Sequence, residues 1–264
     1  MSYKEIQCKN ALNNVSGRLP YKWDLNIFYR GCVHQCQYCF ALYSHQYLEV
    51  NTGDFFKDIF VKTNIVDKLE EKLSSPSWKR EVVNIGGVTD SYQKAEANYK
   101  LMPDILKLFI KYKTPIIISL KSDLILRDYD LIDELSQITY VNIAATITTT
   151  DEGVRQKLEP GGVSSARRFE MLRTFRKTNA SIGLHMMPIV PYLTDVYESV
   201  DNLFFPAKDI NTHYILPSVL YLRGPTRKSF LVLLQKNILF IILFLKNFIK
   251  RVAWIKTIRT AYML

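Results

Sequence analysis

The sequence predicts an α/β fold, a partial (β/α)6 TIM-type barrel, from two observations. Short apolar runs rich in β-branched residues alternate with segments of helical periodicity, the pattern of a parallel sheet with crossover helices. Six such β/α units follow one another without an obvious break, and a chain of 264 residues with 48% hydrophobic content can form one such domain. In barrels of this type the chemistry lies at the C-terminal ends of the strands.

The first strand is expected at 23–29, where it delivers a cysteine-rich loop, and a helix follows at 64–73. A short buried strand at 82–85 ends in two glycines. Pro103 suits the first turn of the next helix, because its missing N–H costs nothing there. The remaining strands are expected at 115–120, 140–147, 181–189 and 214–220, and the remaining helices at 129–136, 165–177 and 196–204.

Three cysteines, Cys32, Cys36 and Cys39, have the spacing C-x3-C-x2-C in the loop after the first strand. Three thiolates of one loop can hold three irons of a cubane cluster, and no fourth cysteine follows, so one iron lacks a protein ligand. An open iron beside a strand-loop-helix pattern indicates a bound, reacting cofactor rather than electron storage. A disulfide framework is disfavoured, because four cysteines in this chain follow no secretory signal.

A zinc site is the alternative, since zinc accepts three sulfurs and one nitrogen and His34 lies inside the motif. The short loop makes tetrahedral wrapping by all four groups awkward, so a solvent-side or second-shell role is expected for His34. Cys8 lies outside the motif and is expected to be a structural or free thiol.

The run from Asn26 to Ala41, including Arg30-Gly31 and Tyr38, resembles the radical S-adenosylmethionine (SAM) superfamily, and more specifically the spore photoproduct lyase family and its uncharacterised relatives. The resemblance covers about residues 23–228. Its further matching segments are Gly53-Asp54-Phe55, Val61-Lys62, Thr89-Asp90-Ser91-Tyr92-Gln93, Glu96, Lys121-Ser122, Glu159-Pro160, Arg167-Arg168, 188–195 and 220–225.

The resemblance implies a metal-binding enzyme with a 4Fe–4S cluster on the three cysteines and SAM on the open iron. Such an enzyme cleaves SAM reductively, and the 5′-deoxyadenosyl radical abstracts hydrogen from a substrate, here unidentified. It also implies a flavodoxin- or ferredoxin-type electron donor and a cytoplasmic location. Two alternatives remain, namely a DNA photoproduct lyase-like repair enzyme and a non-enzymatic iron–sulfur or zinc-binding protein.

Several residues are candidates for binding SAM at the strand ends. Gly86 and Gly87 let the backbone approach the methionyl amino group, unless they form an ordinary turn, and Thr89 and Asp90 are the nearby polar candidates. The resemblance assigns Lys121 to the cofactor carboxylate, although an ammonium at a strand end is often only solvated.

The remaining candidates are aromatic, hydroxyl and imidazole side chains. Thr148 is a candidate for the ribose or carboxylate of SAM, and Tyr38 for the adenine. His185 and His213 are expected to be structural, Tyr43 and Tyr92 could line the cavity, and no catalytic residue is assigned.

The match to the lyase is broken before the Thr-Asp segment. The DNA-repair members carry a cysteine there that returns a hydrogen atom to the product, whereas this chain has Gly86-Gly87-Val88. This departure argues against thymine-dimer repair by that mechanism and favours another substrate.

The net charge of +10 comes almost entirely from the end of the chain. Residues 210–264 carry nine Lys or Arg and no Asp or Glu, whereas the preceding residues carry 26 basic and 25 acidic side chains. The main domain is therefore nearly neutral, and a nucleic-acid partner is not favoured.

Three regions are expected: an N-terminal extension at 1–22, the barrel at 23–228 and an atypical apolar, basic tail at 229–264. The longest apolar run of the tail, eight residues, is shorter than the roughly 20 that span a bilayer, so a membrane partner is not expected. A frameshifted or truncated end is favoured over a genuine helix that faces a membrane or packs through Phe230, Leu233 and Leu234.

Overall fold

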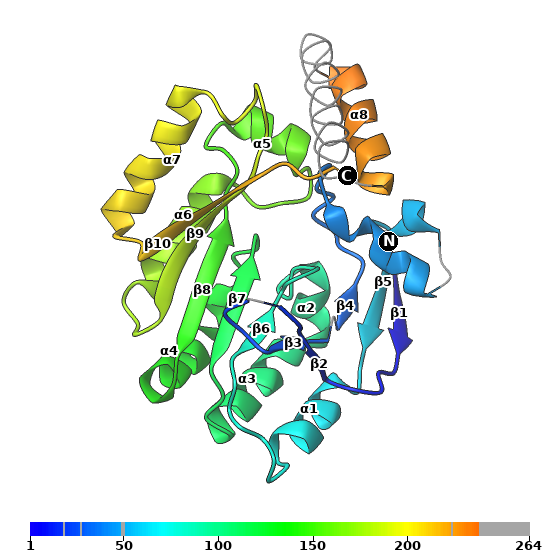
Figure 1. Cartoon of the computed structure of the whole chain (residues 1–264), viewed down its shortest axis with the longest axis vertical. Coiled ribbons are helices and arrows are strands. Elements are labelled where there is room, and N and C mark those ends of the chain that lie inside the picture. Colours follow the sequence, from blue (N-terminus) through cyan, green and yellow to red (C-terminus); the bar gives the residue numbers. More distant parts are fainter. Residues whose placement is uncertain (18, 27, 49–50, 223, 238–264) are drawn as a thin grey trace, which may run out of the picture.

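The structure, a computed structural model, describes residues 1–17, 19–26, 28–48, 51–222 and 224–237 (Figure 1). Its main sheet has seven strands in the order β10-β9-β8-β7-β6-β3-β2. The six parallel strands are β3 (Trp23–Leu25), β6 (Val83–Ile85), β7 (Ile116–Leu120), β8 (Val141–Thr146), β9 (Ser181–Ile189) and β10 (Tyr214–Val219). The short strand β2 (Leu12–Asn14) pairs antiparallel with β3. This topology confirms the predicted partial (β/α)6 barrel.

The crossover helices form a layer on one side of the sheet (Figure 1). Their bounds are α1 (Ile65–Leu73), α2 (Lys94–Tyr99), α3 (Leu101–Lys111), α4 (Tyr129–Ile138), α5 (Glu152–Leu158), α6 (Ser165–Phe175) and α7 (Tyr197–Ile210). Within this group, α1 contacts α3, α3 contacts α4, and α6 contacts α7. The helix predicted at 196–204 continues to Ile210.

The core lies between the sheet and these helices. All six residues of β8 are buried, as expected for a central parallel strand that is covered on both faces. Phe109 of α3, Ile132 of α4 and Phe175 of α6 are fully buried and belong to the same hydrophobic cluster. The strands are therefore held rigidly, and their C-terminal ends form a fixed platform.

A second, three-stranded sheet was not predicted. It has the order β1-β5-β4, from β1 (Ser2–Ile6), β4 (Tyr29–Arg30) and β5 (Asp58–Lys62). The single strand predicted at 23–29 is thus divided between the two sheets, and the N-terminal extension contributes a strand to each. The cysteine loop follows β4, and the 3-10 helices η1 (Phe40–Leu48) and η2 (Thr52–Asp54) connect it to β5.

Helix α8 (Pro225–Asn237) covers the cysteine loop. Phe230 and Leu234 are fully buried in a cluster that includes Cys36 and Tyr38. The hydroxyl of Thr226 donates to the carbonyl oxygen of Cys39 at 2.6 Å. The described part of the tail therefore packs on the loop rather than on the strands. Residues 238–264 lie outside the described residues, so the frameshift interpretation stays a prediction.

Candidate active site

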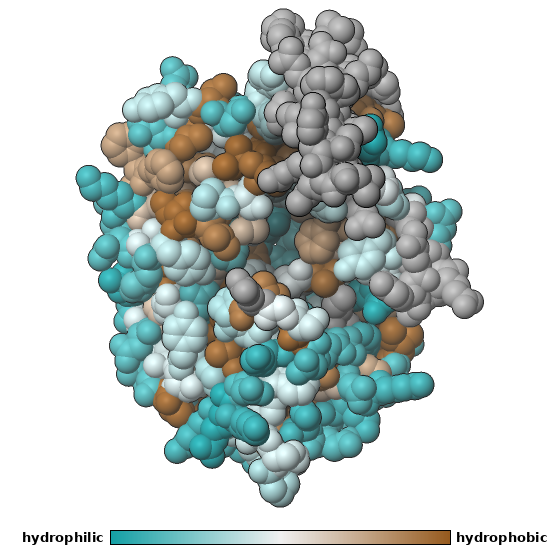
Figure 2. Space-filling view, in the orientation of Figure 1, coloured by the Kyte–Doolittle hydropathy of each residue, from teal (hydrophilic) through white to brown (hydrophobic). Residues whose placement is uncertain are grey.

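A cavity of about 840 Å³ extends along one face of the main sheet and reaches the C-terminal ends of its parallel strands. Figure 2 shows a hollow near the centre of the view, with hydrophobic side chains along part of its border. The lining comes from the segment before β3, from the cysteine loop, and from β6, β7, β8, β9 and β10 with the loops that follow β6, β7 and β10. The fold thus brings together loops that are far apart in the sequence, as barrels of this type do.

The three cysteines of the motif all line this cavity. Cys32 and Cys36 are buried and Cys39 is half-buried. The loop turns sharply at Gly31, whose φ is +97° and where a Cβ atom would lie 2.4 Å from the carbonyl oxygen of Asp58. Burial raises the pKa of each of the three thiols to about 12. A bound cation would reverse this preference and hold them as thiolates.

Three cysteine thiols of one loop are a donor set that suits an iron–sulfur cluster. Within the described residues, no three His, Cys, Asp or Glu side chains gather closely enough to hold one ion. A cluster makes no such demand, because each thiolate binds a different iron and the sulfurs need not meet at one point. Cys8 is not part of the set: it is buried elsewhere, and its thiol contacts Asn64 Oδ1 at 3.3 Å.

One expectation placed His34 on the solvent side of the loop. The side chain is instead buried, with only 4% of its surface exposed. Its Nε2 lies 3.0 Å from Asp90 Oδ2, and its Nδ1 lies 3.3 Å from the carbonyl oxygen of Gly161. Both ring nitrogens are therefore engaged, which argues against His34 as a fourth zinc ligand. The side chain instead connects the cysteine loop to its neighbours.

The end of β6 brings its glycines to the cavity, as predicted. Gly86 has a φ of +85°, and a Cβ atom there would lie 2.3 Å from the carbonyl oxygen of Ser119. A Cβ atom on Gly87 would lie 2.7 Å from Asn84 Nδ2. Both residues line the cavity, so bare backbone is exposed to any bound molecule.

Thr89 and Asp90 also line the cavity, but their polar groups are engaged by the protein. The hydroxyl of Thr89 donates to the carbonyl oxygen of Tyr29 at 2.6 Å. The Asp90 carboxylate accepts from the backbone N–H groups of Tyr92, Lys121 and Ser122 at 2.8, 2.6 and 3.1 Å. Burial alone would raise the pKa of Asp90, but hydrogen bonds from His34 and these amides outweigh it and lower the pKa. A contact of either residue with SAM stays a prediction.

Lys121 lines the cavity at the end of β7, with its Nζ 5.8 Å from the centroid of the Tyr38 ring. Burial would lower the pKa of this lysine, but its electrostatic interactions with Cys36 and Glu159 outweigh burial and raise it. Its ammonium is therefore charged at neutral pH and close to the cysteine loop. This is the position in which it could bind a carboxylate.

A buried ion pair behind the cysteine loop was not predicted as part of the site. The carboxylate Oε2 of Glu159 lies 2.5 Å from the guanidinium Nη2 of Arg168, and both side chains are fully buried. The hydroxyl of Tyr38 donates to Glu159, which also accepts from Thr148 Oγ1 at 3.4 Å. Thr148 is not among the residues that line the cavity, so its role with SAM stays a prediction. The only signal of this pair in the sequence was the family resemblance at Glu159-Pro160 and Arg167-Arg168.

Three polar side chains of β8, β9 and β10 that line the cavity lie close together, namely Asn142, His185 and Tyr214. The hydroxyl of Tyr214 donates to Asn142 Oδ1 at 2.9 Å and lies 3.4 Å from His185 Nε2. Gly183 makes room for this ring, because a Cβ atom there would lie 2.1 Å from Tyr214 Cζ. Burial and the charge of Lys121 lower the pKa of His185 to about 4, so its imidazole is neutral at neutral pH.

Of the remaining candidate residues, His213, Tyr43 and Tyr92 do not line the cavity, whereas His185 does. His213 accepts from the backbone N–H of Ile182 at 2.8 Å and has a structural contact, as expected. His185 lines the cavity, and its expected structural role stays a prediction. Neither Tyr43 nor Tyr92 is among the lining residues. No sequence pattern marked Asn142 or Tyr214, because each has a partner in another strand.

The chain matches the radical SAM superfamily over residues 26–203. An uncharacterised protein of Mycobacterium tuberculosis is 36% identical over 239 residues, which cover 89% of this chain and 70% of that protein. An uncharacterised protein of Methanocaldococcus jannaschii is 30% identical over 193 residues, which cover 73% of this chain and 69% of that protein.

Solved structures of spore photoproduct lyase have the same fold. The lyase complexed with dinucleoside spore photoproduct gives a TM-score of 0.65 at 12% identity, covering 89% of this chain and 66% of the lyase chain. A lyase variant with bound AdoMet and the same dinucleoside gives a TM-score of 0.63 at 12% identity, with the same coverage. The chain thus spans about two thirds of the length of these structures. Separately, none of the described helices is both long enough and apolar enough to cross a membrane.

Proposed function

Because this chain belongs to the radical SAM superfamily, we propose that it is an enzyme with a 4Fe–4S cluster on Cys32, Cys36 and Cys39 and SAM on the open iron. One observation carries this proposal: the three thiols line a single cavity together with the strand-end glycines and Lys121, and no other cysteine lines it among the described residues. When bound, the cluster and SAM supply reductive cleavage of the sulfonium to a 5′-deoxyadenosyl radical.

Different residues of the cavity bind different parts of SAM. The ammonium of Lys121 binds the carboxylate, and the bare backbone at Gly86 and Gly87 accommodates the methionyl amino group. Tyr38, fixed through its hydroxyl to Glu159, forms the wall next to the adenine. His34 and Asp90 hold the cysteine loop against the ends of β6 and β7.

We propose a substrate other than a DNA photoproduct. Lys121 is the one Lys or Arg side chain that lines the cavity among the described residues, whereas binding a phosphate backbone relies on several such contacts. The cavity also lacks a thiol beyond the cluster cysteines to return a hydrogen atom. Asn142, His185 and Tyr214 are polar side chains that also line the cavity and are candidates to contact the substrate.

Anaerobic reconstitution with iron and sulfide, followed by dithionite and SAM, tests the proposal. We expect about four irons per chain, iron–sulfur absorption in the visible range and formation of 5′-deoxyadenosine. The Cys36→Ala variant is the control and should form none. A fully loaded protein that releases no 5′-deoxyadenosine would refute the enzyme, and bound zinc without iron–sulfur absorption would support a non-enzymatic metal protein. Dinucleoside spore photoproduct added to the same reaction should be returned unchanged.

A further inference from the structure

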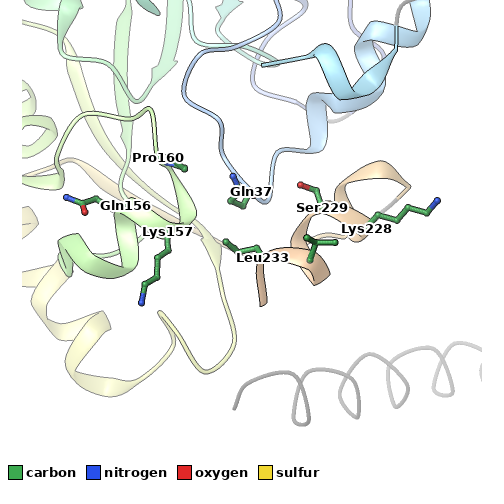
Figure 3. A pocket seen from close by; sticks show the side chains of 8 residues that line it. Gln37, Gln156, Lys157, Pro160, Lys228, Ser229 and Leu233 are labelled. Carbon is green, nitrogen blue, oxygen red and sulfur yellow. The ribbon is translucent and has the colours of Figure 1, made fainter. Parts of the chain in front are cut away.

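The cysteine loop has an outer face as well as the face that lines the cavity. Gln37, in the middle of the motif, lines a separate groove of about 570 Å³ between α5 and α8 (Figure 3). The backbone N–H of Gln37 donates to the carbonyl oxygen of Leu158 at 2.9 Å and fixes the loop to the end of α5. The groove is therefore a surface that directly adjoins the cysteines from outside the cavity.

The floor of this groove is apolar and continuous with the packing around the cysteines. Val232 and Leu233 of α8 line it. Leu233 belongs to the buried cluster that contains Cys36 and Tyr38. The groove and the cysteine loop therefore share one apolar cluster.

The rim of the groove is basic. Lys157 of α5 and Lys228 of α8 line it, and no Asp or Glu does. Both lysines are exposed, and neither forms an ion pair with another described residue. Figure 3 shows them on opposite sides of Leu233, with Gln37 between them. A positive rim around an apolar floor complements a partner with an acidic ring around its contact site.

We propose that this groove, lined by Gln37, Lys157, Lys228, Val232 and Leu233, is the docking surface for an acidic one-electron carrier protein of the flavodoxin or ferredoxin type. The inference rests on the proposed function, because the cluster on the three cysteines is the destination of the electron. The carrier is oxidised by one electron and the cluster is reduced by one electron, with no bond made or broken. A folded carrier cannot enter a cavity of about 840 Å³, so it must approach from the outer face.

The test uses the reconstituted full-length chain and a purified bacterial flavodoxin. Lys157→Glu and Lys228→Glu are combined in one groove variant. The matched control combines Lys79→Glu and Lys177→Glu, which make the same change of charge at exposed sites in the loops before β6 and β9, at the opposite end of the barrel. Isothermal titration at low ionic strength measures flavodoxin affinity, and stopped-flow absorbance measures the rate of cluster reduction by reduced flavodoxin.

In the groove variant we expect both the affinity and the reduction rate to fall by roughly tenfold or more, since rim charges steer association. Added salt should weaken wild-type binding and have little effect on the variant. The control should stay close to wild type. Equal values in the groove and control variants would overturn the proposal. So would a DNA duplex that binds wild type more tightly than flavodoxin does and loses its affinity in the groove variant.

Dithionite separates this inference from the proposed function. It is a small reductant that needs no docking surface, so dithionite-driven formation of 5′-deoxyadenosine should be the same in the wild type and the groove variant. A groove variant that forms 5′-deoxyadenosine with dithionite and still accepts electrons from flavodoxin at the wild-type rate would refute the docking surface alone.

Discussion

The imidazole Nε2 of His34 lies 3.0 Å from the carboxylate Oδ2 of Asp90, and both side chains are buried. His34 belongs to the cysteine loop, whereas Asp90 follows β6 and also accepts the backbone N–H groups of Lys121 and Ser122 after β7. One carboxylate therefore joins the loop to two strand ends. Its structural effect is to fix the cysteines relative to the rest of the cavity.

Asp90→Asn should destabilise the protein. The Asp90 carboxylate accepts four hydrogen bonds, from His34 and from three backbone N–H groups. The Asn side chain has only one oxygen that accepts, and its NH2 group donates. Some of the buried donors therefore lose their acceptor. We expect the free energy of unfolding of the metal-free, reduced protein to fall by about 2–3 kcal/mol, measured by urea denaturation. Asp104→Asn on the surface of α3 is the control and should change it by less than about 1 kcal/mol. If both substitutions lowered the free energy of unfolding by the same amount, Asp90 would not have this structural role.

Each of Cys32→Ala, Cys36→Ala and Cys39→Ala should greatly reduce the iron bound after anaerobic reconstitution, because the chain offers the cluster only three thiolates. Cys8→Ala is the matched control, since its thiol contacts Asn64 away from the cavity. Iron analysis and visible absorbance measure the outcome. A Cys8→Ala variant without cluster, or a Cys36→Ala variant with a full one, would contradict the assigned ligands.

Lys121→Ala should weaken SAM binding and leave the iron content unchanged. A hydrogen bond from an ammonium to a carboxylate contributes on the order of 1.5–3 kcal/mol, so the affinity should fall by roughly tenfold or more. Equilibrium binding of SAM to the reconstituted protein measures it, with Lys79→Ala as the exposed control. Unaltered affinity would place Lys121 outside the cofactor pocket.

Gly183→Ala should destabilise the protein, because the added methyl group would overlap the Tyr214 ring. Overpacking of this kind costs about 1–3 kcal/mol. The same substitution in a Tyr214→Ala background should cost clearly less, since the clashing ring is absent. Urea denaturation of the four proteins gives the coupling free energy. A cost that is equal in both backgrounds would show that Tyr214 does not lie over Gly183.

Lys62 should make the stability depend on pH above neutrality. Burial and the charge of Arg30 lower its pKa to about 8 from an ordinary value of 10.5. Between these two values the unfolded chain binds more protons than the native one, so the free energy of unfolding rises with pH. Relative to Lys62→Met, the wild type should gain on the order of 2 kcal/mol between pH 7 and pH 10.

Urea denaturation of the metal-free, reduced protein at several pH values measures this gain. Lys79→Met, at an exposed position, is the control and should keep a constant difference from the wild type. A difference between Lys62→Met and wild type that does not change with pH would show that Lys62 has an ordinary pKa.

The sequence by itself determined the order of the parallel strands, the main crossover helices and the cysteine motif. These features are local: Ile65, Leu69 and Leu73 share a helix face because of their spacing, and the predicted α1 buries those three residues. The three cysteines lie within eight positions, so their common loop needed no tertiary information. The end-of-strand rule then placed Gly86, Gly87 and Lys121 near them.

Only the tertiary structure decided how that platform is held together. Tyr38 and Glu159 are 121 positions apart, and His34 and Asp90 are 56 apart. The strands β1 and β5 also pair across 56 positions, as Ser2 with Asp58 shows. The packing of α8 on the cysteine loop joins the two ends of the barrel region. Periodicity reports which face of an element is buried but not what it is buried against. These pairings follow from the packing of distant segments, where a buried polar group must find a partner in whichever segment comes close.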